Sequence, residues 1–194
     1  VNLTAPTGSG TGNGVWTLDV AAIPTPTPTP GLLRNISTRD DVLTGDDVLI
    51  RGFIITGGTT PKTVVIRGLG PSLATVIPPV AGALADPVLT LNLPDGSVIT
   101  NDNWKNNSAG DQTIITDSGL APGSDAEAVI VATLPPVDPN VAGSGMYTAK
   151  PSGVHNGTGL GLMAFYDLDD RPTTTSQRAT ISTRASGGSH PTVT

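Results

Sequence analysis

Four of the five acidic side chains between residues 102 and 127, around the Asn-Asp-Asn-Trp run at 101–104, form the richest group of oxygen ligands in the chain. They are Asp102, Asp111, Asp125 and Glu127. Calcium binds six to eight oxygen atoms, often supplied by loops, so convergence of these carboxylates would create a calcium site. No Asp-x-Asp-x-Asp-Gly loop is present, and Asp and Asn side chains also cap turns. Two interpretations therefore stay open, a calcium site and a set of turn caps.

Residues that could carry out catalysis are scarce. His155 lies beside a turn pattern and His190 in a polar tail, and no Gly-x-Ser-x-Gly motif accompanies either of them. The Gly-rich run 157–162 precedes a strand pattern, whereas a dinucleotide-binding loop opens a helix. Aromatic residues make up 3% of the chain, so stacking platforms for sugars are few. We expect no enzymatic activity, and no cofactor unless the four carboxylates bind calcium.

The composition of the 194 residues limits which kinds of partner and which fold classes are expected. A net charge of −6 argues against nucleic-acid binding, which needs a basic face. No run approaches 18 apolar residues, so no membrane span is expected. The chain has no cysteine, 24 Gly and 18 Pro, and only 13% charged residues. Abundant Thr, Val and Ile between Gly and Pro favour many short strands joined by tight turns.

The element pattern predicts an all-β fold, an antiparallel β-sandwich of the jelly-roll or immunoglobulin-like kind with extended terminal strands. Turn signals such as Pro-Asp-Gly at 94–96 separate the strands. The predicted strands cover residues 32–39, 48–56, 62–68, 88–93, 97–100, 112–116, 128–134, 145–149 and 160–168. Only residues 71–84 are expected to hold a short helix. The predicted core residues are Ile50, Phe53, Ile55, Val65, Leu89, Leu91, Ile130, Leu134, Tyr147, Leu162 and Phe165.

The two ends of the chain repeat parts of its middle. Ile-Ser-Thr-Arg at 36–39 recurs at 181–184, and Gly-Thr-Gly-Asn-Gly-Val at 10–15 resembles Gly-Thr-Gly-Leu-Gly-Leu at 157–162. The offsets, 145 and 147, are nearly equal, which favours a modular repeat over chance similarity. Residues 1–23 then resemble the last strand of one module, and 31–170 form a complete β-sandwich module. Residues 171–194 form a C-terminal extension that begins the next module. We therefore expect the numbering to start either after processing or partway through a longer polypeptide.

A Pro-Thr linker separates the first segment from the sandwich. Residues 24–30 read Pro-Thr-Pro-Thr-Pro-Thr-Pro, a pattern typical of a semi-rigid polyproline II spacer. At ~3.1 Å per residue such a linker spans roughly 20 Å. A comparable Pro-Thr run at 172–175 precedes the C-terminal strand pattern. We expect these spacers to discourage the terminal strands from folding back onto their own sandwich in the same register. The alternative is that both strands pair with their own sandwich and the chain is a monomer.

The central block carries a set of motifs that are specific in combination. They are Asn-Ile-Ser-Thr-Arg at 35–39, Gly-Asp-Asp-Val-Leu-Ile-Arg-Gly-Phe-Ile-Ile-Thr-Gly at 45–57, Ile-Arg-Gly-Leu-Gly-Pro-Ser-Leu at 66–73, Ala-Asp-Pro-Val-Leu at 85–89, Asn-Asp-Asn-Trp at 101–104, Leu-Ala-Pro at 120–122, Ala-Val-Ile-Val-Ala-Thr-Leu-Pro-Pro at 128–136, Tyr-Thr-Ala at 147–149 and Tyr-Asp-Leu at 166–168. Together they resemble a module repeated in large secreted bacterial proteins, similar to the pre-peptidase C-terminal class of β-sandwich. The departures are Asp47, Arg51 and an insert at 137–142. The resemblance implies a non-catalytic repeat unit that is secreted or displayed on the cell surface, and it supplies no catalytic residues.

These observations predict a structural subunit of an extracellular or cell-surface assembly. Unpaired strand edges are templates for strands of other chains, and head-to-tail donation does not close, so we expect a homopolymeric filament formed by exchange of terminal strands. The expected assembly residues are Val15, Trp16, Leu18, Val20 and Ile181, with Trp16 as the main apolar anchor. The alternative is a non-catalytic module of a larger secreted protein that binds a glycan or another surface ligand.

Overall fold

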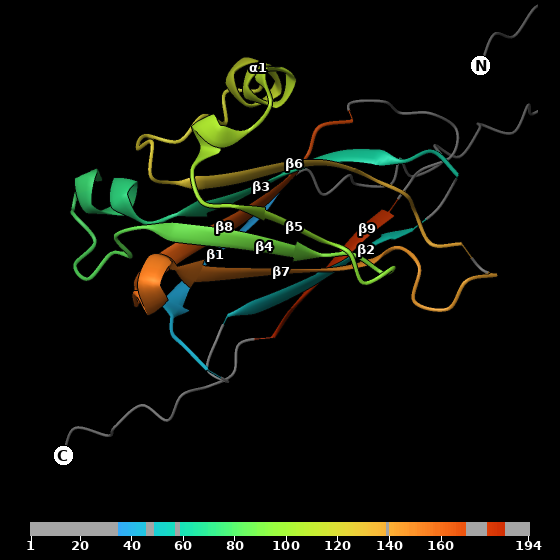
Figure 1. Cartoon of the computed structure of the whole chain (residues 1–194), viewed down its shortest axis with the longest axis horizontal. Helices are drawn as coiled ribbons and strands as arrows, with labels where there is room; N and C mark the ends of the chain where they lie inside the picture. The colour runs from blue at the N-terminus through green and yellow to red at the C-terminus, as the bar shows by residue number, and fades with distance from the viewer. Residues whose placement is uncertain (1–34, 46–48, 57–58, 139, 170–177, 185–194) are drawn as a thin grey trace, which may run out of the picture. The chain divides into compact units, whose positions relative to one another are not determined.

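The computed structural model describes residues 35–45, 49–56, 59–138 and 140–169, together with the backbone of 178–184. These residues form an all-β sandwich of two antiparallel sheets, as predicted (Figure 1). The strands are β1 (Asn35–Val42), β2 (Ile50–Thr56), β3 (Lys62–Leu69), β4 (Pro87–Asn92), β5 (Val98–Asn101), β6 (Ala128–Leu134), β7 (Met146–Gly153), β8 (Gly159–Asp167) and β9 (Arg178–Arg184). The helical elements are η1 (Pro71–Thr75), η2 (Trp104–Asn106), α1 (Ala109–Asp117) and η3 (Val154–Asn156). None of the described helices is long and apolar enough to cross a membrane.

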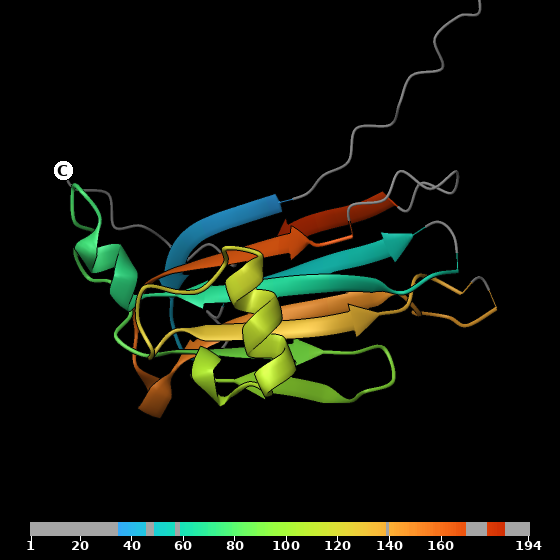
Figure 2. The same ribbon diagram turned by 90° about the horizontal axis from the view of Figure 1, so that it is seen from above.

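The first eight strands have the order of a jelly roll. One sheet runs β1-β8-β3-β6, and the other runs β5-β4-β7-β2-β9. The pairs β1–β8, β2–β7, β3–β6 and β4–β5 are nested within one another, as in a long hairpin rolled into two sheets. β9 is an addition to this plan, because it extends the second sheet beyond β2. In Figure 2, β1 and β9 lie at one side of the sandwich and β5 lies at the opposite side.

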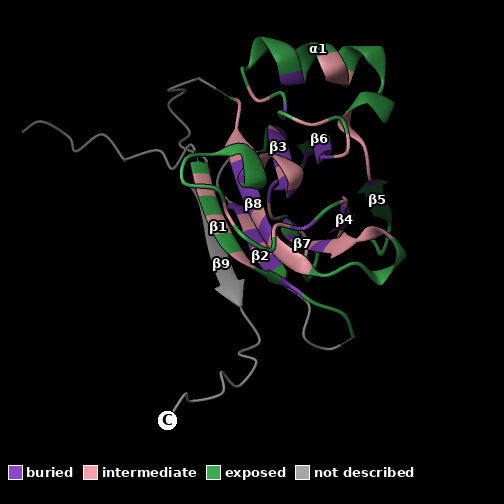
Figure 3. Cartoon of the chain, turned by 90° about the vertical axis from the view of Figure 1, so that its left-hand side faces the viewer, coloured by how far each residue is buried: buried purple, intermediate pink, exposed green. Residues whose placement is uncertain are grey.

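The main core fills the space between the two sheets, where alternate residues of β2, β4 and β7 are buried (Figure 3). Phe53 of β2 stacks on Tyr147 of β7, with ring centroids 5.2 Å apart. Phe53 also meets Phe165 of β8 edge to face at 5.1 Å, so these rings connect the two sheets. Burial raises the pKa of Tyr147, with a further contribution from Asp95. The Tyr147 hydroxyl donates a hydrogen bond to the Pro135 carbonyl at 2.7 Å.

Nine of the eleven predicted core residues are buried, and Ile50 and Leu162 are the exceptions. Ile50 is 40% exposed because the next residue, Arg51, occupies the inward position of β2. Leu162 is half-buried because its neighbours Gly161 and Met163 occupy the buried positions. At both sites an apolar residue stands on the outer face of its strand, which composition alone does not reveal.

A second, smaller cluster lies on the outer face of the β1-β8-β3-β6 sheet, under α1. It contains Val65, Val129 and Ile115, with Trp104 and other partly buried apolar side chains around it. The predicted strand at 112–116 is wrong, because these residues belong to α1. The Ser108 hydroxyl accepts a hydrogen bond from the backbone N–H of Asp111 and caps the helix. The predicted helix at 71–84 is reduced to the 3₁₀ turn η1.

Candidate functional site

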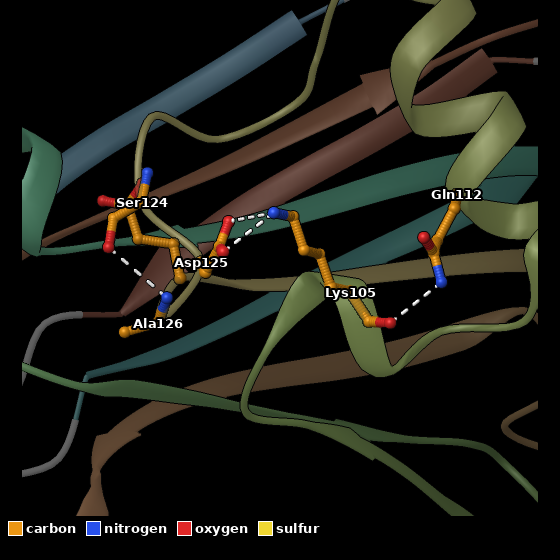
Figure 4. A network of polar contacts seen from close by, with 6 residues as sticks. Lys105, Gln112, Ser124, Asp125 and Ala126 are labelled. Carbon is orange, nitrogen blue, oxygen red and sulfur yellow. Dashed lines mark hydrogen bonds and ion pairs between the residues drawn. The ribbon is translucent and has the colours of Figure 1, made fainter.

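The four carboxylates predicted to bind calcium do not converge. Within the part of the chain that the structure describes, no group of three or more His, Cys, Asp or Glu residues could hold a metal ion. Asp125 forms an exposed ion pair with Lys105 at 2.7 Å, and the Gln112 amide donates to the Lys105 carbonyl (Figure 4). Asp111 accepts a hydrogen bond from Ser108 at the start of α1. Asp111 therefore has the capping contact that the turn-cap interpretation describes, whereas Asp125 is an ion-pair partner.

The other two carboxylates have different surroundings. Asp102 accepts one long, exposed contact from the Asn106 amide at 3.4 Å. Glu127 is fully buried, and its Oε1 accepts hydrogen bonds from the Gly70 N–H (3.0 Å), the Ser72 N–H (2.9 Å) and the Ser72 hydroxyl (2.6 Å). The Glu127 side chain therefore connects the start of β6 to the Gly-Pro-Ser-Leu loop. That loop needs glycine at position 70, because a Cβ there would lie 2.1 Å from the Leu84 carbonyl oxygen.

Asn101 closes one side of the sandwich. It is the last residue of β5, at the edge of one sheet, and its Oδ1 accepts the backbone N–H of Val129 in β6, at the edge of the other sheet, at 2.9 Å. Its Nδ2 donates to the Asn103 carbonyl at 3.0 Å. One amide side chain thus bridges the edges of both sheets.

Asn107 and Trp104 complete this closure. The Asn107 Nδ2 donates to the carbonyls of Val129 (2.9 Å) and Trp104 (2.8 Å). The backbone N–H of Trp104 donates to the Glu127 carbonyl at 2.8 Å. Both outward backbone groups of Val129 are therefore bonded to side chains of the 101–108 segment. We call this the closed side of the sandwich. The Asn-Asp-Asn-Trp motif has a structural role there, as the cap of a sheet edge.

The opposite side, which we call the open side, ends in β1 and β9. All seven residues of β9 pair with β2, and Ile181 stands opposite Phe53. The C-terminal spacer was expected to discourage folding back, and that expectation is wrong for β9, which pairs with β2 of its own chain. The other predicted assembly residues, Val15, Trp16, Leu18 and Val20, lie outside the described residues, as does His190. His155 is exposed, as expected for a surface residue.

The register shows which backbone groups β9 leaves unpaired. In an antiparallel ladder the N–H and C=O of a residue face the same neighbour, and successive residues face opposite neighbours. The Ile55 N–H donates to the Gly145 carbonyl just before β7 at 3.0 Å, so odd-numbered residues of β2 face β7 and even-numbered ones face β9. Even-numbered residues of β9, Ser182 among them, therefore face β2. The backbone groups of Ile181 and Thr183 face away, where no described strand pairs with them.

The same rule applies to β1, whose sequence β9 repeats. The Leu168 N–H donates to the Thr63 carbonyl at 3.0 Å, so even-numbered residues of β8 face β3 and odd-numbered ones face β1. Through the β1–β8 register, the backbone groups of Ile36 and Thr38 face β8. These two residues are the counterparts of the two outward-facing residues of β9. The free edge of β9 thus presents the backbone groups that β1 uses to bind β8.

Arg51 places a charge inside the open side. The residue is 1% exposed, and neither Nε nor Nη1 has a hydrogen-bond partner among the described residues. Burial lowers the pKa of Arg51, and the charge of Asp40 on β1 partly offsets that effect. A buried guanidinium without full hydrogen bonding is costly. The sequence marked Arg51 only as a departure from the resembled module.

No family model, curated protein or solved structure matches this chain. The site is therefore defined by geometry, a closed side capped by side-chain amides and an open side ending in two strands of related sequence. The sequence identified the repeated strand through the Ile-Ser-Thr-Arg motif. Which backbone groups face outward depends on the strand pairing, and only the structure supplies it.

Proposed function

We propose that this chain is a non-catalytic structural module of an extracellular or cell-surface assembly, which polymerises head to tail through its terminal strands. The observation that carries the proposal is the seating of β9 along the whole of β2. β9 shares the run Ile-Ser-Thr-Arg with β1, so a strand that resembles a module's opening strand occupies the edge of the preceding module. Strand addition of this kind uses backbone hydrogen bonds, which any extended segment can supply.

The connection between β8 and β9 allows the same pairing between copies. Residues 168–177 join the two strands, and ten residues can reach roughly 33 Å when extended. Exchange of an identical element between copies preserves every contact made within one copy, so it costs little. A head-to-tail exchange has different surfaces on its two partners and generates a filament when the rotation does not close.

One sequence feature supports a location outside the cell, the resemblance to repeated modules of secreted bacterial proteins. The alternative of glycan binding has less support, because sugar platforms need exposed aromatic rings. Among the described aromatic residues, Phe53, Tyr147 and Phe165 are buried in the core, and Trp104 and Tyr166 are partly buried against the cluster under α1. Glycan binding is therefore treated as an outcome of the experiment.

The experiment is electron microscopy and sedimentation of the purified full chain over a wide concentration range. We expect filaments of one diameter, and sedimentation that shifts to larger species as concentration rises. A chain that stays monomeric at every concentration would contradict the proposal. A monomer that also binds a glycan array would favour the alternative.

A further inference from the structure

The free edge of β9 has a specific requirement for its partner. Ile181 and Thr183 direct their backbone groups away from β2, and their counterparts in β1, Ile36 and Thr38, bond to β8. Had the register of β9 on β2 been shifted by one residue, the wrong backbone groups would face outward. The exposed edge therefore suits a strand that resembles β8.

The chain contains such a strand at its other end. Residues 10–15 resemble 157–162 at an offset of 147, which aligns 15–20 with the main part of β8. The run Val-Trp-Thr-Leu-Asp-Val at 15–20 alternates apolar and polar residues, the period of a strand. In β1–β8 pairing, Ser37 stands opposite Ala164. Transferring both offsets places Ser182 opposite Thr17.

We propose that the free edge of β9 binds residues 15–20 of a second copy, antiparallel, with Ser182 opposite Thr17. The inference rests on the proposed function and specifies the joint. A second copy is the expected occupant because the proposed assembly needs a contact between copies, and the Pro-Thr run at 24–30 gives residues 15–20 a reach of roughly 20 Å toward a neighbour. β9 then pairs with β2 on one side and with the neighbour's first strand on the other.

The residues that this pairing places opposite each other also support it. Transferred to the joint, the β1–β8 register sets Ile181 opposite Leu18 and Thr183 opposite Trp16. Opposite residues of an antiparallel pair share one face of the sheet, so Leu18 falls where Phe165 stands opposite Ile36. Each copy has one such edge and one such segment, so the contact is head to tail and repeats along a filament when the rotation does not close it into a ring.

Introduced cysteines test the register, because the chain has none of its own. In the β1–β8 ladder, the backbone N–H and C=O of Ser37 point away from β8, and those of Ala164 point toward β3. The two residues therefore form a non-hydrogen-bonded pair, in which the Cα atoms lie about 4.5 Å apart. That spacing suits a disulfide. We would mix Thr17→Cys protein with Ser182→Cys protein under oxidising conditions and measure covalent dimers. The control mixes Thr17→Cys with Thr183→Cys, whose side chains would point to opposite faces.

We expect at least tenfold more dimer from the matched mixture than from the control. Filaments without preferential matched dimers would overturn the register while leaving the proposed function intact. In a chain carrying both Thr17→Cys and Ser182→Cys, a disulfide confined to single chains would overturn the choice of a second copy. Failure of the unmodified chain to assemble at all would count against the proposed function itself, as well as against this joint.

A pair of proline variants tests the edge independently. Thr183→Pro removes an outward-facing N–H and leaves the donors to β2 in place, since proline is tolerated where the N–H faces away from the ladder. Ser182→Pro removes a donor that faces β2. We expect Thr183→Pro to abolish elongation with an unchanged melting temperature, and Ser182→Pro to lower the melting temperature as well. Elongation of Thr183→Pro at the wild-type rate would overturn the proposal.

Discussion

The two sides of the sandwich treat their sheet edges in opposite ways. On the closed side, the amides of Asn101 and Asn107 bond both outward backbone groups of Val129, and the 101–108 segment covers the strand. On the open side, β9 offers Ile181 and Thr183 without a described partner. Unpaired edges invite other strands, and proteins usually block them. The contrast teaches that edges are blocked selectively, because the chain caps the edge at the start of β6 and leaves the outer edge of β9 without a partner among the described strands.

Removal of the N-terminal segment should have the largest effect on assembly through the open side. A chain lacking residues 1–23 should keep the sandwich, whose described strands all lie between 35 and 184. It should lose the elongation that depends on the outer edge of β9, since β9 would have no β8-like strand to bind, whereas elongation by exchange of β9 onto β2 alone would persist. Electron microscopy and thermal melting followed by circular dichroism would check both expectations. Filaments of unchanged diameter from the truncated chain would show that the N-terminal segment is not the donor.

Glu127 should have the largest effect on stability of any single side chain on the closed side. Glu127→Leu leaves three donors of Gly70 and Ser72 without their acceptor in a buried place, and we expect the free energy of unfolding to fall by about 4 kcal/mol. Glu127→Gln keeps an oxygen at Oε1 and loses only the 3.4 Å contact with Ser124, so it should cost about 1 kcal/mol. Urea unfolding of both variants would measure the difference. Equal losses would mean that the charge, and not the acceptor, matters.

Asn101 tests whether the closed side depends on its amide cap. Asn101→Ala leaves the N–H of Val129 without its acceptor, and we expect the free energy of unfolding to fall by about 2 kcal/mol. The uncovered edge should also make the protein prone to irregular aggregation. Asn106→Ala is the matched control, because its 3.4 Å contact is exposed and its loss should stay within about 0.5 kcal/mol. Similar unfolding curves for the two variants would contradict the role of the cap.

Replacement of the buried Arg51 on the open side should stabilise the fold, whereas the replacements on the closed side destabilise it. Its lowered pKa means that the protonated side chain is less favourable in the folded chain than in the unfolded one. Arg51→Met replaces it with an apolar group of similar size, and the free energy of unfolding should rise by about 1 kcal/mol. Arg39→Met, at an exposed position of β1, should change it by less than about 0.5 kcal/mol. Destabilisation by Arg51→Met would reveal a partner for the guanidinium.

The smallest expected effect concerns the β4–β5 turn, next to the closed side. Hydrogen bonds from the Ser97 hydroxyl and N–H lower the pKa of Asp95. A lowered carboxyl pKa stabilises the fold above the ordinary Asp value of about 4, and this contribution disappears as pH falls through the folded-state pKa. Ser97→Ala should therefore be slightly less stable than the wild type at neutral pH, and the two should converge in acid. Urea unfolding at both pH values would measure it, and a gap that widens in acid would contradict the assignment.

Strand identity was predictable from the sequence, because alternating apolar residues and turn signals are local. The predicted strand at 128–134 coincides with β6, and the others, apart from 112–116, agree within a few residues. The error at 112–116 arose because Thr and Ile favour strands, while the cap formed by Ser108 and Asp111 selects a helix. That Ser-x-x-Asp signal was present in the sequence and could have been used.

The candidate sites were harder to predict, since they depend on contacts between distant residues. Proximity in sequence brought Asp102, Asp111, Asp125 and Glu127 together as one group, but it gives no direction for their side chains. Burial of Glu127 against the loop at Gly70 follows from the pairing of β3 with β6. The outward groups of β9 depend on a register that no local pattern encodes.

The nested strand pairing also sets an order of folding. The β4–β5 hairpin joins residues close in the chain, such as Leu91 with Ile99, whereas Asn35 of β1 pairs with Tyr166 of β8, 131 positions later (166 − 35). Pairing of distant strands requires closure of a long loop, and the entropy cost of that closure makes folding slow. We therefore expect the central hairpin to form early and β1 to dock late, although β1 is synthesised first. During synthesis, β1 would therefore stay unpaired until the last residues of β8 have been added to the chain.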